Sequence, residues 1–156
     1  MKAQKMFLVL FLFVGFSSIA QEGFHITSAT KQGWAGGQAQ SGYGTNYVFD
    51  FITTCNSSNL KINKVWIDDR FYSVDYYLSN KQEVVDSFSE NDTLSFRVSY
   101  RAYWKGYSLD DYDLDYNVAD PPIDFNGEAL IEYTFLNKNY FYVIKELEEL
   151  PYLAYP

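Results

Sequence analysis

Apolar and polar residues alternate with a period of two along most of the chain after its first twenty residues, and this pattern predicts β-strands with one buried face. The clearest example is 92–104, where Leu94, Phe96 and Val98 alternate with serine and arginine residues. One face of such a strand packs in a core and the other meets solvent. No long segment shows the 3.6-residue period of an amphipathic helix. Strands are predicted over 23–32, 44–54, 60–69, 70–78, 83–89, 92–104, 127–136 and 140–147.

Seven to eight short strands separated by turn residues predict an all-β chain. The fold that we expect is an immunoglobulin-like antiparallel β-sandwich, with a small closed barrel as the alternative architecture. The sequence Asn-Lys-Asn at 137–139 predicts a hairpin connection between the last two strands. Pro151 and Pro156 are expected to prevent regular strand pairing in the final segment.

The first twenty residues have the three parts of a secretory signal peptide. Lys2 and Lys5 supply the positive start, an apolar run follows, and small residues precede Gln21. The apolar run is shorter than the ~20 residues that a membrane-spanning helix needs. We therefore expect residues 1–20 to be removed and 21–156 to form a single domain, secreted or periplasmic, with no membrane span after cleavage.

Composition narrows the classes of partner. Loss of Lys2 and Lys5 with the leader would change the formal net charge from −8 to −10, and such an acidic surface disfavours nucleic acid. Cys55 is the only cysteine, so no disulfide within the chain can stabilise the domain. The 15 tyrosines, 13 phenylalanines and 3 tryptophans favour strands and leave aromatic rings available for ligands.

Several stretches of the chain together resemble a known group of proteins. They are a leader ending in Ala-Gln, "GWAGG…GYGTNY", "KVWIDD", "DTLSFRVSYR" and "GEALIEY…LNKNYFYVIK". These stretches are similar to uncharacterised small secreted β-sandwich proteins of the Bacteroidota. The resemblance implies export and an immunoglobulin-like fold, and it implies no functional residues.

Two aromatic groups are candidates for ligand binding. The glycine-rich segment 33–44 is predicted to be a loop, because its spacing fits no phosphate-binding motif and it leads into a strand. Trp34 and Tyr43 on this loop could stack on sugars or hold a peptide, and packing over a sheet edge is the alternative. The second group could form a stacking face or simply pack across strands. It consists of Tyr103, Trp104 and Tyr107.

The aspartate-rich stretch 108–122 contains a candidate calcium site. Asp111, Asp113, Asp115 and Asn117 occupy every second position, as at the start of an EF-hand loop. The match then fails, because Tyr116 stands where the loop needs glycine and Pro122 where it needs glutamate. The alternative is a solvated or acidic edge strand, with Tyr112, Leu114, Tyr116 and Val118 on its apolar face.

The sequence offers little for catalysis. A single histidine, His25, excludes zinc sites built from several histidines and leaves any serine triad dependent on that residue. We therefore predict a non-catalytic exported module without a cofactor that acts by protein–protein contact or as an envelope component. The alternatives are a carbohydrate-binding module that uses exposed Trp and Tyr, and a calcium-stabilised adhesion-type domain.

Overall fold

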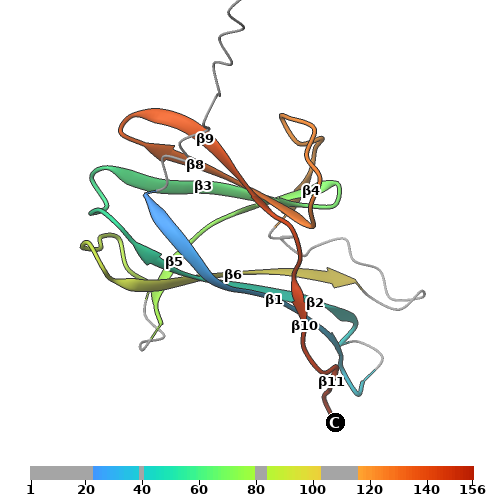
Figure 1. The fold of residues 1–156 in the computed structure, drawn as a ribbon. Coiled ribbons are helices and arrows are strands. Elements are labelled where there is room, and N and C mark those ends of the chain that lie inside the picture. Colours follow the sequence, from blue (N-terminus) through green and yellow to red (C-terminus); the bar gives the residue numbers. More distant parts are fainter. Residues whose placement is uncertain (1–22, 39–40, 80–83, 103–115) are drawn as a thin grey trace, which may run out of the picture.

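The chain is described by a computed structural model over residues 23–38, 41–79, 84–102 and 116–156, with the backbone alone at 116 and 117. These residues form strands and no helix, so the prediction of an all-β fold is confirmed. Two sheets face each other as a β-sandwich (Figure 1). The strands are β1 (Phe24–Ala35), β2 (Tyr43–Thr53), β3 (Leu60–Ile67), β4 (Arg70–Ser73), β5 (Tyr76–Leu78), β6 (Thr93–Ala102), β7 (Tyr116–Val118), β8 (Ala129–Phe135), β9 (Lys138–Ile144), β10 (Glu148–Glu149) and β11 (Leu153–Ala154).

The first sheet has the strand order β10-β1-β2-β6-β5, and β11 also pairs with β1. The second sheet has the order β7-β4-β3-β8-β9. Neighbouring strands are antiparallel except where β10 and β11 run parallel to β1. The chain leaves the second sheet after β9 and crosses to the outer side of β1, so that this C-terminal tail covers an edge of the first sheet (Figure 1).

Aromatic side chains fill the space between the sheets. Phe49 and Phe96 stack with ring centroids 4.7 Å apart, and both side chains are fully buried. Phe24 packs edge-to-face on Tyr133 of the opposite sheet at 5.0 Å. Such pairs add about 0.5–1.5 kcal/mol to the stabilisation that burial alone provides. The alternation of apolar residues in β2 and β6 therefore produces the core that it predicts.

Tyr76 ties the two sheets together by hydrogen bonds. Its hydroxyl donates to the Ile62 carbonyl oxygen (2.8 Å) and accepts from the Ile62 N–H (2.6 Å). Ile62 precedes a bulge in β3, where the register with β8 shifts between Ile62 and Lys64. The strand β4 pairs with β3 only from Lys64 onward, and the phenol of β5 bonds both backbone groups of Ile62. Burial raises the pKa of Tyr76 to about 12.

Several predicted boundaries are corrected. The single strand predicted over 70–78 divides into β4 and β5, which belong to different sheets. The loop predicted over 33–44 is shorter than expected, because β1 extends to Ala35 and β2 begins at Tyr43.

The last hairpin and the tail also differ from the prediction. The turn of the β8–β9 hairpin is formed by Leu136 and Asn137, both with positive φ, rather than by 137–139. Pro151 does not prevent pairing, since β10 and β11 pair with β1 on either side of it.

Candidate functional site

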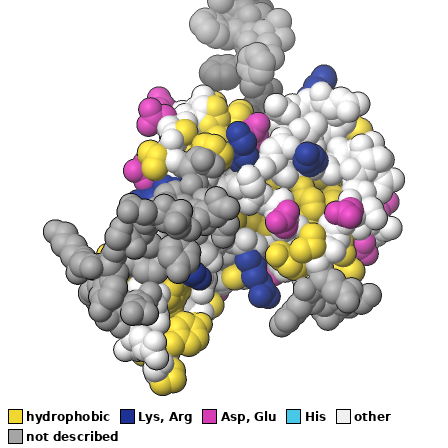
Figure 2. All heavy atoms as spheres, turned by 180° about the vertical axis from the view of Figure 1, so that it is seen from behind, with side chains coloured by type: hydrophobic (Ala, Val, Ile, Leu, Met, Phe, Trp, Pro, Cys, Tyr) yellow, Lys and Arg dark blue, Asp and Glu magenta, His cyan; other side chains and the backbone are white. Residues whose placement is uncertain are grey.

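Three exposed tyrosines lie at the end of the first sheet where β1 ends and β2 begins. Tyr43 opens β2 and is 39% exposed, whereas Tyr152 and Tyr155 belong to the tail and are 63% and 50% exposed. Strand register places Tyr43 beside Ala35 and Ala35 beside Ala154. We call this group the tyrosine end. Apolar side chains, tyrosines included, gather at this extremity of the molecule in Figure 2.

Hydrogen bonds from β1 hold the tail in place. The Leu150 N–H donates to the Lys31 carbonyl oxygen and the Tyr155 N–H donates to the Ala35 carbonyl oxygen, both at 2.9 Å. The Gln32 side-chain amide donates to the Pro151 carbonyl oxygen at 2.8 Å. These contacts fix the positions of the two tail tyrosines, so a ligand would meet a preorganised surface.

Trp34 points to the opposite face of β1 from Gly33 and Ala35, where it contacts Tyr155, and it is not itself exposed. Only 8% of its surface remains accessible, which corrects the expectation of an exposed ring. Its ring lies over Gly44, the cross-strand partner that has no side chain. The Arg101 guanidinium lies 5.4 Å from the ring centroid, and Tyr155 packs edge-to-face at 6.4 Å. Trp34 is therefore buried because its ring packs over Gly44 and is covered by Arg101 and Tyr155.

Small residues separate Tyr43 from Tyr152, whereas Tyr155 lies on the other face of the sheet with Trp34. By strand alternation, Tyr152 lies beside Gly33, and the Cβ position of Gly33 would touch its ring. Tyr43 lies two strands away on the same face, about 10 Å across the strand direction, given a spacing of 4.8 Å between neighbouring strands. Gly33 and Ala35 lie between the rings of Tyr43 and Tyr152, and their small size leaves a shallow depression between the two rings.

A polar pocket of about 260 Å³ lies between the sheets at the same end of the sandwich. Lys31 and Glu128 form an ion pair across it, with Nζ and Oε1 2.7 Å apart. The other carboxylate oxygen of Glu128 accepts a hydrogen bond from the Leu147 N–H. The bond from Lys31, and next the bond from Leu147, lower the pKa of Glu128, and the same pair raises the pKa of Lys31.

Tyr47 lines the pocket from β2, and burial, followed by the nearby Asp68 carboxylate, raises its pKa. At the turn between β3 and β4, Arg70 approaches Asp68 and Asp69 at 3.8 and 3.5 Å. The Arg70 guanidinium lies 4.5 Å from the centroid of Tyr100. The pocket therefore offers positively and negatively charged hydrogen-bonding groups next to aromatic rings.

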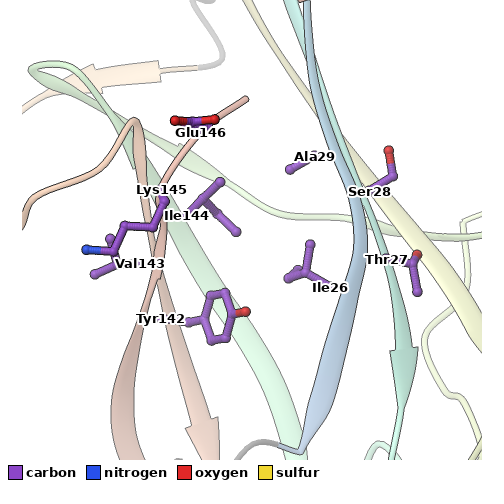
Figure 3. A pocket seen from close by; sticks show the side chains of 9 residues that line it. All are labelled: Ile26, Thr27, Ser28, Ala29, Tyr142, Val143, Ile144, Lys145 and Glu146. Atoms are coloured by element: carbon purple, nitrogen blue, oxygen red, sulfur yellow. The ribbon is translucent and has the colours of Figure 1, made fainter. Parts of the chain in front are cut away.

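A second depression, of about 420 Å³, lies between β1 and β9 at the side of the sandwich. Figure 3 shows Tyr142 and Ile144 of β9 pointing toward Ile26 and Ala29 of β1. We call it the β1–β9 groove. Its walls belong to the two different sheets, and the tail crosses at one end near Glu146.

The remaining predicted site residues fall mostly outside the described part of the chain. These are Tyr103, Trp104, Tyr107, Asp111, Asp113 and Asp115. Asn117 lies in β7, at the edge of the second sheet. Val118, expected on an apolar strand face, is 71% exposed, because β7 is a three-residue outer strand. Among described residues, no three His, Cys, Asp or Glu side chains are grouped to hold a metal ion.

Tyr152 and Tyr155 were not predicted as site residues. The signal in the sequence was weak, since Tyr-Leu-Ala-Tyr between two prolines shows no strand pattern of useful length. Within the described ranges no helix is long and apolar enough to cross a membrane. No protein-family model, curated protein or solved structure matches the chain. The fold defines the class of protein, a β-sandwich. Any function must therefore be inferred from the residues on its surfaces.

Proposed function

We propose that the chain is an exported, non-catalytic binding module, and that it contacts a protein partner through the tyrosine end. The observation that carries this proposal is the exposure of Tyr43 and Tyr152 on one face of paired strands, with exposed Tyr155 on the other face of the same sheet end, against Trp34. Tyrosine supplies a large contact area with a polar tip and few rotatable bonds, and it is enriched at protein interfaces. The hydrogen-bonded tail lowers the entropy lost on binding.

We also propose that the sandwich is immunoglobulin-like, and strand order supports this assignment. With strands named in chain order, β1-β2-β6-β5 corresponds to A-B-E-D of an immunoglobulin sheet. The order β4-β3-β8-β9 corresponds to C′-C-F-G of the opposite sheet. Such domains commonly present binding loops at the ends of the sandwich, and the tyrosine end lies at one of them.

The test is capture of a partner from the envelope of the native cell by the purified domain, followed by a substitution series. Tyr152→Ser and Tyr155→Ser remove exposed rings from the tail, and each should weaken binding at least tenfold if the ring is a centre of the interface. Tyr77→Phe, on a different strand, is the matched control and should leave binding unchanged. Equal binding by the wild type and the two serine variants would refute the assignment of the site.

Carbohydrate binding is the second candidate, and the polar pocket beside the tyrosines favours it. Lys31, Asp68 and Glu128 could hydrogen-bond sugar hydroxyls while a tyrosine stacks on the ring face. Quenching of tryptophan fluorescence by oligosaccharides should then depend on Tyr43, with Tyr43→Ser abolishing it and Tyr43→Phe retaining it. Absence of quenching together with no signal on a glycan array would reject this alternative.

A further inference from the structure

Three of the four lateral sheet edges carry features that prevent pairing with another strand. The outer side of β1 is covered from Thr30 to Ala35 by the tail, which presents Glu148 and Glu149 and is interrupted by Pro151, and the uncovered first half of β1 contains a bulge between Ile26 and Ser28. The strands β5 and β7 have three residues each, and β5 is further bridged by Val84. Short strands, charges, proline and coverage all discourage association between edges.

The fourth edge, β9, has only one of these features, a charge at its first residue, Lys138. It has seven residues and pairs with β8 in regular register without a bulge. Residues 139–144, Asn-Tyr-Phe-Tyr-Val-Ile, contain no charge, proline or glycine. No strand of the described residues pairs with its outer side. A segment of this composition on an open edge is a strong candidate for pairing with another strand.

The direction of the backbone groups of β9 follows from one hydrogen bond. The Glu128 N–H donates to the Ile144 carbonyl oxygen at 2.9 Å, so the backbone of Ile144 faces β8. Because these groups alternate along an antiparallel strand, those of Asn139, Phe141 and Val143 face outward. Three equally spaced residues therefore present both donor and acceptor at the edge.

We infer that this edge binds a second copy of the chain, with two β9 strands pairing antiparallel about a two-fold axis at Phe141. The outward groups are symmetric about Phe141, so Asn139 would oppose Val143 of the second copy and Phe141 would oppose its equivalent. Such a self-complementary arrangement closes at two copies. It joins the two second sheets into one continuous sheet.

Side chains agree with the antiparallel register. Lys138 would oppose Ile144 of the second copy, whereas a parallel arrangement in register would place Lys138 beside Lys138. On the inner face, Tyr140 of the second copy would lie beside Tyr142, over the β1–β9 groove (Figure 3). Aromatic pairs across strands stabilise sheets, and the groove of about 420 Å³ provides space for the added ring.

Charge predicts how this association depends on salt. Each copy carries a formal net charge of −8, while 139–144 is uncharged. The copies therefore repel over a distance that salt shortens, to about 8 Å at physiological ionic strength. Dimerisation should strengthen when salt is raised, unlike an association that depends on ion pairs.

Sedimentation equilibrium of the purified chain, from micromolar to near-millimolar concentration, is the direct test. The wild type should form a species of twice the monomer mass. Val143→Pro removes an N–H that faces away from β8, so the β8–β9 pairing is retained. Two hydrogen bonds per dimer are lost, and the dissociation constant should rise about tenfold to a hundredfold. Val143→Thr keeps the N–H and should remain dimeric, with circular dichroism confirming the fold of both variants.

A charge exchange at the symmetry axis tests the register. Phe141→Lys and Phe141→Glu each place two like charges opposite one another, and each variant alone should be monomeric. Mixed together, they should form a heterodimer. A wild type that is monomeric at every concentration would overturn the inference, and the partner of β9 would then be a strand of another protein. Open-ended assembly into larger species, or two variants that do not associate on mixing, would overturn it as well.

Discussion

Replacing Tyr76 with phenylalanine should destabilise the domain through the loss of one hydroxyl. That hydroxyl satisfies both backbone groups of Ile62, at 2.6 and 2.8 Å, and Ile62 is only 1% exposed. Leaving one buried polar group unpaired costs about 1–3 kcal/mol, and here two groups lose their partner. We expect the free energy of unfolding to fall by about 2–4 kcal/mol, a large share of the ~5–15 kcal/mol of a typical domain.

Urea unfolding followed by tryptophan fluorescence measures this change. The midpoint should fall while the slope stays constant, because the surface exposed on unfolding hardly changes. Tyr77→Phe removes a hydroxyl from the neighbouring position, which points to the other face of β5, and should change the free energy by less than about 0.5 kcal/mol. A Tyr76→Phe variant as stable as this control would refute the argument that the hydroxyl satisfies the backbone groups of Ile62.

The same residue predicts a loss of stability in alkali. The folded state holds the Tyr76 proton with a pKa of about 12, whereas an unfolded tyrosine loses its proton near pH 10. The folded state therefore binds this proton more tightly, so the stabilisation is present below about pH 10 and falls as pH rises toward 12. Tyr76→Phe should flatten this part of the profile, and an unchanged slope would contradict the assignment.

Three further predictions concern other parts of the chain. Leu136→Asn should stabilise the domain by about 1 kcal/mol in urea unfolding, because Leu136 is exposed with φ of 49° and asparagine tolerates that region better. Glu128→Gln should speed amide exchange at Leu150 and Tyr155 about two- to fivefold, since the ion pair with Lys31 is lost. The pKa of Glu128 is lowered in the folded state, so the carboxylate stays charged down to acidic pH. The wild type should therefore show the same faster exchange only as pH falls below about 4.5. Millimolar calcium should leave the thermal midpoint unchanged if the aspartates at 111–115 form a solvated face, and a rise of several degrees would support a metal site.

The sequence predicted the buried faces of the long strands well, because burial on a pleated sheet requires alternation. Phe49 and Phe96 could be assigned to the core on that ground alone. The break within 70–78 could not be predicted. No glycine or proline marks it, and the bond from Tyr76 to Ile62 joins strands of different sheets, which a local pattern does not reveal.

The candidate site was only partly predictable for a similar reason. Tyr43 follows a glycine-rich segment and was recognised as a candidate. Tyr152 and Tyr155 become surface features through parallel pairing with β1, which is more than a hundred residues away in the chain. Local pattern carries no information about such distant pairing, so the tail had the appearance of an irregular end.

The path of the tail explains why the two proposed surfaces are independent. After Ile144 the chain leaves the second sheet. Leu147 is buried, and its N–H donates a hydrogen bond to the Glu128 carboxylate. These two contacts direct residues 148–154 onto β1. This crossing covers the edge of the first sheet and creates the tyrosine end. It also leaves β9 without a covering strand among the described residues. Because the two surfaces lie on different sheets, a dimer through β9 would leave both tyrosine ends accessible, and its two binding sites would act together on a partner with repeated epitopes.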